Sequence, residues 1–123
     1  MQAMTISAEE AFRRLTMGDT AVLAAARART PDRPARGSLD HRMEALLQVG
    51  ALVAVGAPAS SYRATVQTAL RAGARMEDLL GVLVAVSEVV GTARVVAAAP
   101  ALALAAGYDV EAALEQPIAH AGH

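Results

Sequence analysis

The chain is rich in small apolar residues and almost free of aromatic ones. Apolar residues make up 54% of its 123 residues, about a quarter of all residues are alanine, and only Phe12, Tyr62 and Tyr108 are aromatic. Alanine is the strongest helix former, and its small side chain lets helices approach closely. The composition therefore predicts a single all-α domain of closely packed helices, large enough to bury a core but too small for two independent ones.

Capping residues and helix breakers predict two short helices at the N-terminus. The Ser7-Ala8-Glu9-Glu10 pattern is a capping box, in which the serine hydroxyl and the glutamate carboxylate each satisfy a backbone amide of the other. The first helix should run to about Met17, and Gly18-Asp19 should end it and begin a second helix that reaches about Ala28. Prolines and Gly37 mark residues 30–38 as a linker.

The remaining segments read as a helical domain over residues 38–115, preceded by N-terminal helices and a linker (1–37) and followed by a flexible tail (116–123). Asp40 and Gly56 bracket one helix, and Pro100 should kink or divide another. The helices are expected over residues 40–55, from 59 or 60 to 73, 77–90, 92–107 and 110–115.

Charge and cysteine content exclude several classes of protein. Arginine supplies all eleven basic residues, and the net charge of -1 gives no overall attraction toward nucleic acid. The chain has no cysteine, which excludes disulfides, thiolate nucleophiles and peroxidase cycling through thiols. No His and carboxylate spacing suits a metal, and nothing indicates a cofactor. Acidic Glu9 and Glu10 do not suit a signal peptide, so the cytoplasm is the expected location.

The segment 81–107 is apolar enough to raise the question of a membrane span. Glu88, Gly91, Arg94 and Pro100 interrupt it near its middle, which favours buried helices of a soluble protein over a span. A domain of this size has difficulty covering so much apolar helix surface alone. The sequence therefore predicts a homo-oligomer that shares these helices, with no membrane partner.

An ordered series of short elements resembles the carboxymuconolactone decarboxylase and alkylhydroperoxidase D-like family. The series covers about two thirds of the chain, and its order and spacing carry the resemblance. It implies an all-α bundle of about six helices that assembles as a homotrimer or as a hexamer of two such rings. Its elements are Leu39-Asp40, Gly56, Ala69-Leu70-Arg71-Ala72-Gly73-Ala74, Glu77-Asp78-Leu79-Leu80 and Gly91-Thr92-Ala93-Arg94.

The reactive motif of that family is missing. The redox branch has a C-x-x-C-x-x-x-H motif whose three positions fall on Pro58, Ser61 and Thr65 here. The decarboxylase branch lacks the cysteines but usually keeps a histidine at the position of Thr65. The resemblance therefore implies the fold of the family without its thiol chemistry.

Glu88 is the first candidate for chemistry. It lies within the apolar run 82–90, where burial would raise the pKa of its carboxyl group and suit a general acid or base. The alternative is a structural ion pair with Arg94 or Arg63 that fixes the subunit geometry. The sequence leaves both interpretations open, with a slight preference for the ion pair.

Three hydroxyl residues lie where the family carries its motif. Ser61 and Thr65 are four residues apart, so they share a helix face and could bind a carboxylate or carbonyl oxygen. A helix cap and a packing residue are the more ordinary roles of these two. The Tyr62 hydroxyl could donate to a substrate or lie at a subunit interface.

Cationic side chains complete the set of candidates. Arg94, at a helix start after Gly91, could bind a substrate carboxylate as well as Glu88, and Arg63 is a lesser candidate of the same kind. His41 lies in the first turn of its helix, where exposure to water is favoured over a place in a pocket.

Two functions remain open from the sequence. The first is a cofactor-independent enzyme that acts by proton transfer on a small organic acid or polyketide-like molecule, through decarboxylation, isomerisation or cyclisation. Glu88 would then be the acid or base, with Arg94 and Tyr62 stabilising the developing negative charge. The second is a catalytically inactive relative that serves as an oligomeric binding or scaffold protein, as loss of the motif residues would predict.

Overall fold

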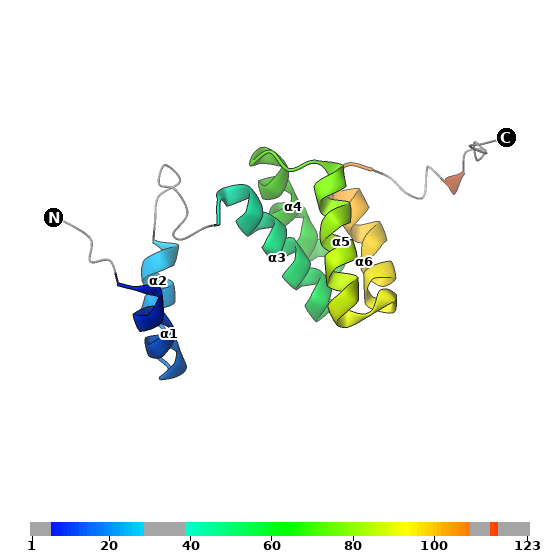
Figure 1. Cartoon of the computed structure of the whole chain (residues 1–123). Helices are drawn as coiled ribbons and strands as arrows, with labels where there is room; N and C mark the ends of the chain where they lie inside the picture. Colours follow the sequence, from blue (N-terminus) through cyan, green and yellow to red (C-terminus); the bar gives the residue numbers. More distant parts are fainter. Residues whose placement is uncertain (1–5, 29–38, 109–113, 116–123) are drawn as a thin grey trace. The chain divides into compact units, whose positions relative to one another are not determined.

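The computed structural model describes residues 6–28, 39–108 and 114–115 (Figure 1). Helices are the only regular secondary structure among these described residues, which confirms the all-α prediction. By its internal contacts the chain divides into two compact units, Met1–Gly37 and Ser38–His123. No described helix is long and apolar enough to cross a membrane. The whole predicted linker, residues 30–38, falls outside the described residues, as do most of the helix 110–115 and the whole tail 116–123.

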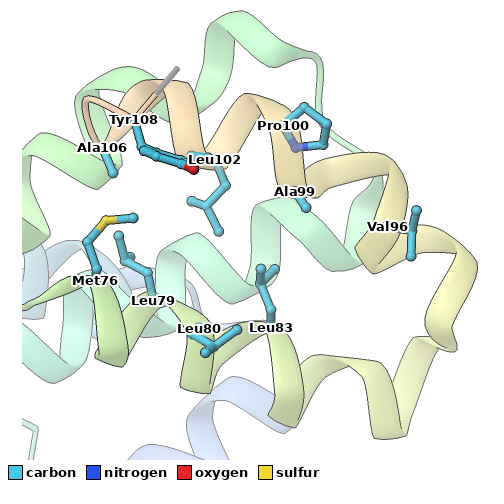
Figure 2. A pocket seen from close by; sticks show the side chains of 11 residues that line it. Met76, Leu79, Leu80, Leu83, Val96, Ala99, Pro100, Leu102, Ala106 and Tyr108 are labelled. Carbon is cyan, nitrogen blue, oxygen red and sulfur yellow. The ribbon is translucent and has the colours of Figure 1, made fainter. Parts of the chain in front are cut away.

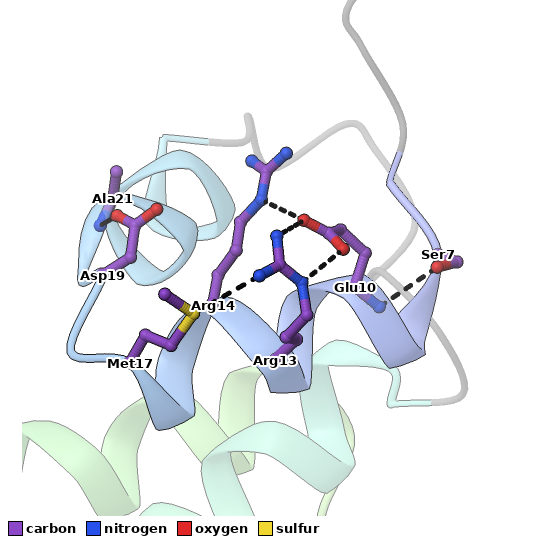
Figure 3. A network of polar contacts seen from close by, with 7 residues as sticks. All are labelled: Ser7, Glu10, Arg13, Arg14, Met17, Asp19 and Ala21. Carbon is purple, nitrogen blue, oxygen red and sulfur yellow. Dashed lines mark hydrogen bonds and ion pairs between the residues drawn. The ribbon is translucent and has the colours of Figure 1, made fainter.

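The first unit contains α1 (Ala8–Thr16) and α2 (Ala21–Arg27), close to the helices predicted there. Only one half of the expected capping box forms: Ser7 Oγ accepts from the Glu10 backbone N–H at 3.1 Å. The Glu10 carboxylate instead accepts from Arg13 and Arg14, each at 2.8 Å (Figure 3). Charge-assisted bonds to two guanidinium groups outweigh a bond to a neutral amide. These bonds lower the pKa of Glu10 to about 2.

The described part of the second unit contains four α-helices and a short 3-10 turn. The predicted helices over 40–55, 59–73, 77–90 and 92–107 are confirmed with small shifts at their ends. Asp40 caps the first of them by accepting from the Met43 backbone N–H at 2.8 Å, and Gly56 ends it in a left-handed conformation. The elements are α3 (His41–Val55), η1 (Ala59–Ser61), α4 (Tyr62–Arg71), α5 (Met76–Val90) and α6 (Thr92–Ala105).

Pro100 lies inside α6 without dividing it, so of the two predicted outcomes the division is wrong and the kink stays a prediction. A proline removes one helical hydrogen bond, because it has no N–H to donate to the carbonyl four residues earlier. Packing against the neighbouring helices holds α6 in place despite this missing hydrogen bond. Gln67 on α4 contributes by donating from Nε2 to the Ala105 carbonyl at 3.0 Å.

The core of the second unit lies where α3, α4, α5 and α6 meet (Figure 1). Close approach of α3 and α5 depends on Gly50, because a Cβ there would lie 3.3 Å from Val86 and 3.4 Å from Val82. This packing of small residues agrees with the alanine-rich composition. The buried core residues are Val49, Val53, Tyr62, Val66, Leu79, Ala98 and Leu102.

Within the described residues of the second unit, one side of α5 is not covered, and its predicted deep burial is not reached there. Leu79 is its only buried residue. Leu80, Val84 and Val89 are 62%, 58% and 85% exposed. The helix is apolar on all sides, but within the described part of the second unit its neighbours α3 and α6 cover only the inner side.

Candidate functional site

A cavity of about 500 Å³ lies where the end of α3, the start of α4, the end of α5 and the first half of α6 meet. Two of its lining side chains are polar, Tyr62 and Arg94, and both were candidates from the sequence. The other positions carry small or branched apolar residues or glycine. The lining residues are Gly56, Ala57, Tyr62, Val90, Ala93, Arg94, Ala97 and Ala98.

Arg94 is held at the C-terminal end of α3. Its Nη1 donates to the Ala54 carbonyl at 3.1 Å. Carbonyls in the last turn of a helix lack an intrahelical donor, and the helix dipole makes this end negative, so a guanidinium group suits the position. A guanidinium group has five N–H donors, and no second partner for Arg94 exists among the described residues. Donors therefore remain available to a ligand.

Tyr62 is the buried polar residue of the cavity wall. It begins α4 and points into the core, where the residue is 1% exposed. Its hydroxyl is enclosed and has no hydrogen-bond partner in the described part of the chain. Burial raises the pKa of Tyr62, so the phenol stays protonated over a wide pH range. A buried hydroxyl without a hydrogen-bond partner lowers the stability of the fold.

Glu88 lies elsewhere, contrary to its predicted burial. It is exposed on the outer side of α5, and within the described residues neither Arg94 nor Arg63 forms an ion pair with it. Val90, two residues later, lines the cavity. Two residues correspond to about 200° around a helix, so Glu88 and Val90 face nearly opposite sides. The apolar run indicated burial on every side, whereas α5 buries only one.

The remaining predicted residues do not join Tyr62 and Arg94. Ser61 ends η1 and Thr65 lies in α4, and both are half-buried without lining the cavity. Arg63 is exposed, and His41 is exposed as expected.

Sequence reasoning missed the small residues that shape the cavity. Gly56 and Ala57 follow α3, and the spacing of Ala93 and Ala97 by four residues places them on one face of α6. That spacing was a detectable signal in the sequence.

A second cavity, a groove of about 350 Å³, lies between α5 and α6 (Figure 2). Its walls are apolar, from Met76, Leu79, Leu80 and Leu83 on one side to Val96 and Pro100 on the other. Tyr108 lies across one end and contributes the only side-chain hydroxyl among the described residues that line the groove. This groove can hold an apolar group, but none of the described residues that line it carries a charge with which to act on a substrate. The cavity of Tyr62 and Arg94 is therefore the candidate functional site.

Metal ligands do not gather near either cavity. Across the residues that the structure describes, no group of three or more His, Asp or Glu side chains could hold a metal ion. The prediction that the protein uses no metal or cofactor stays a prediction.

Comparison with known proteins identifies the family. The sequence pattern of the carboxymuconolactone decarboxylase family matches residues 10–104, which reach from α1 into the last turn of α6. No curated protein and no solved structure matches the sequence significantly. The match covers most of the chain, the described fold is all-α, and the sequence has no cysteine for the thiol motif. The chain therefore belongs to the carboxymuconolactone decarboxylase family, as a member without the cysteine motif.

Proposed function

We propose that the protein is a cofactor-independent lyase, isomerase or cyclase that acts by proton transfer on a small organic acid or a polyketide-like molecule. The observation that supports this function is the presence of Arg94 and Tyr62 in the wall of one cavity. A volume of about 500 Å³ suits a small molecule.

The lining of the cavity favours an anionic ligand with an apolar body. The N–H donors that Arg94 does not give to Ala54 can bind a carboxylate, which is the group that a planar guanidinium recognises best. Val90, Ala93 and Ala97 offer an apolar surface to the rest of the molecule. A neutral ligand of the same shape would forgo the charge-assisted bonds and bind more weakly.

Tyr62 supplies the second polar contact in this proposal. A ligand oxygen that reaches its hydroxyl would satisfy the buried group that now lacks a partner. Because its pKa is raised, the phenol is a hydrogen-bond donor rather than an anion at neutral pH. A donor of this kind stabilises negative charge on a carbonyl oxygen as an adjacent carbon loses its proton.

Glu88 remains the proposed acid or base, but not from its own subunit. In its own chain it faces away from the cavity-lining side of α5. A Glu88 that acts at this cavity therefore has to come from a neighbouring copy. Covering α5 with a second copy would also bring the Glu88 carboxylate out of bulk water and next to groups of another subunit.

The proposed assembly is a homotrimer or hexamer that covers the outer side of α5. Leu80 and Val84, four residues apart on one face, form an exposed apolar surface on this helix. Gly81 lies on the same side, and a Cβ there would meet no atom within 4 Å in the single chain. A glycine inside a helix costs about 1 kcal/mol relative to alanine, and close approach of another helix would offset that cost. The cytoplasmic location and the lack of a nucleic-acid partner stay predictions.

Hydrogen exchange tests the enzyme proposal without knowledge of the product. The protein is incubated in D₂O with levulinate, a small keto acid, and proton NMR follows exchange at the carbons beside the keto group. Wild-type protein should accelerate this exchange, and Glu88→Gln should abolish the acceleration while the assembly and melting temperature stay unchanged. If Glu88→Gln instead alters the assembly or the stability, Glu88 has a structural role.

A second function is supported by the chemistry that the cavity lacks. Among the described residues that line it, none is a carboxylate, histidine, serine or threonine. Pro58, Ser61 and Thr65 also occupy the positions of the family motif. A catalytically inactive relative that binds small acids or serves as an oligomeric scaffold fits this lining. Binding of levulinate without any acceleration of exchange would favour this alternative.

A further inference from the structure

Gly56 lies unusually close to the guanidinium group of Arg94. It is the residue that ends α3, with a φ of 69° in the left-handed region. A Cβ built on Gly56 would lie 2.7 Å from Arg94 Nη1, a distance that side-chain carbons do not tolerate. The same Nη1 atom donates to the Ala54 carbonyl at 3.1 Å. Any side chain at position 56 would therefore compete with Arg94 for its place.

We infer that Gly56 is a positioning residue, whose missing side chain lets Arg94 rest on the end of α3 with its remaining donors available to the cavity. This inference rests on the proposed function for its ligand, a small carboxylate, but its structural part does not. Gly56 and Arg94 both line the cavity, and Ala54 lies two residues before Gly56. The conformation that ends the helix and the space that admits the guanidinium thus come from one glycine.

The alternative role of Gly56 is that of an ordinary helix end, for which glycine avoids backbone strain. Gly73, which follows α4, provides a matched comparison within the same unit. Its φ is 101°, and a Cβ there would meet no atom within 4 Å. Alanine is more strained at 101° than at 69°, because the left-handed well for L-residues is centred near 50–70°. Backbone strain alone thus predicts a larger effect of Gly73→Ala than of Gly56→Ala.

If Gly56→Ala displaces Arg94, ligand binding at the cavity should be weakened more by Gly56→Ala than by Gly73→Ala. The clashing atom is the far end of a flexible side chain, so Gly56→Ala should move the guanidinium while the helices stay in place. Arg94 would then lose its bond to Ala54 and the geometry with which it meets a carboxylate. Loss of one charge-assisted contact corresponds to about tenfold weaker binding or more.

The first arm of the test needs no ligand. The Arg94 side-chain Nε–Hε signal is assigned in the full-length protein by its absence from Arg94→Gln, and it is then compared between Gly56→Ala and Gly73→Ala by NMR. The inference predicts that the signal shifts or broadens in Gly56→Ala and stays unchanged in Gly73→Ala. An unchanged signal in Gly56→Ala, or equal changes in both variants, would overturn it. If Gly56→Ala does not fold, Gly56→Asn replaces it, since asparagine tolerates the left-handed region.

The second arm measures benzoate affinity by calorimetry in the same variants. Gly56→Ala should bind benzoate about tenfold more weakly than wild type, and Gly73→Ala should match wild type. In an Arg94→Gln background, Gly56→Ala should have no further effect. A moved Arg94 signal with unchanged benzoate affinity would contradict the positioning role. If wild type itself binds no benzoate, the proposed function fails, while the NMR arm still decides whether Gly56 positions Arg94.

Discussion

The two cavities of the helical bundle differ more in chemistry than in size. The cavity at the end of α3 combines a guanidinium group with a buried phenol, whereas the groove between α5 and α6 is lined by apolar side chains and one tyrosine. The two tyrosines also differ, because Tyr62 is 1% exposed and lacks a partner for its hydroxyl, while Tyr108 is 50% exposed. A half-exposed hydroxyl can bond to water, so it needs no ligand.

This comparison shows why volume alone does not identify a functional site. An apolar groove can bind by excluding water, but it fixes neither the charge nor the orientation of what it binds. A buried hydroxyl and a cation with unused donors both favour a polar, negatively charged ligand. If this distinction is correct, substitutions in the first cavity change acid binding and substitutions in the groove do not.

The largest effect is expected from Arg94→Gln. Removing the cation should weaken benzoate binding by about tenfold to a hundredfold, the range for a hydrogen bond to a charged group. Calorimetry with benzoate and with neutral benzamide measures the effect, and benzamide should bind weakly to both proteins. Arg63→Gln is the matched control, since Arg63 is exposed and does not line the cavity. Equal losses in the two variants would point to a general effect of charge.

Tyr62→Phe should have different effects on the free energy of unfolding and on the affinity for benzoate. The substitution keeps the ring in the core and removes a buried hydroxyl without a partner, so the free energy of unfolding should stay the same or rise by about 1 kcal/mol. Benzoate affinity should fall several-fold if the hydroxyl contacts the ligand. Urea unfolding and calorimetry give the two values, with Tyr108→Phe as the control. A clear loss of stability in Tyr62→Phe would mean that the hydroxyl already has a partner, such as a bound water.

Leu80→Gln tests whether the groove between α5 and α6 takes part in acid binding. Leu80 lines the groove between α5 and α6 and is 62% exposed, so the substitution changes the groove with a small effect on the fold of the subunit. Benzoate affinity should stay within about twofold of wild type, and subunit stability within about 0.5 kcal/mol. Light scattering during size-exclusion chromatography reports in addition whether the assembly weakens, as the proposed burial of α5 requires. A large loss of benzoate binding would place the acid in the groove.

The smallest effect concerns Glu10, which lines neither cavity. Its pKa is lowered from 4.5 to about 2 by the bonds from Arg13 and Arg14. A lowered carboxyl pKa gives stability that is fully present above the unfolded value and is lost as the pH falls through the folded value. The ion pairs on α1 should thus remain intact down to about pH 3 and break near pH 2. NMR titration of the Glu10 carboxyl carbon measures this, and a midpoint near 4.5 would show that the pairs do not persist in solution.

Local signals in the sequence predicted the helices well. Asp40 caps the start of α3, and Gly56 ends the helix in a left-handed conformation. Both effects are local, so the bounds of α3 could be predicted from these two residues. Pro100 does not divide α6, because the cost of one missing hydrogen bond is local, while the packing that offsets it comes from other helices. The same applies to Ser7 and Glu10, where the competing arginine bonds decided the outcome.

The candidate site was only partly predictable. Tyr62 and Arg94 were identified from their place in the family pattern, and the structure brings them to one cavity. Ser61 precedes Tyr62 by one residue and misses the cavity, because direction around a helix changes by about 100° per residue. Glu88 was misplaced because an all-apolar helix gives no indication of which side its neighbours cover.

A crystal structure of the assembled protein with bound benzoate would show which of the two cavities binds the acid. We expect the carboxylate on the guanidinium of Arg94, with the ring against Val90, Ala93 and Ala97 and an oxygen or a bridging water within reach of the Tyr62 hydroxyl. Benzoate in the groove between α5 and α6, with the cavity of Tyr62 and Arg94 empty, would contradict this expectation.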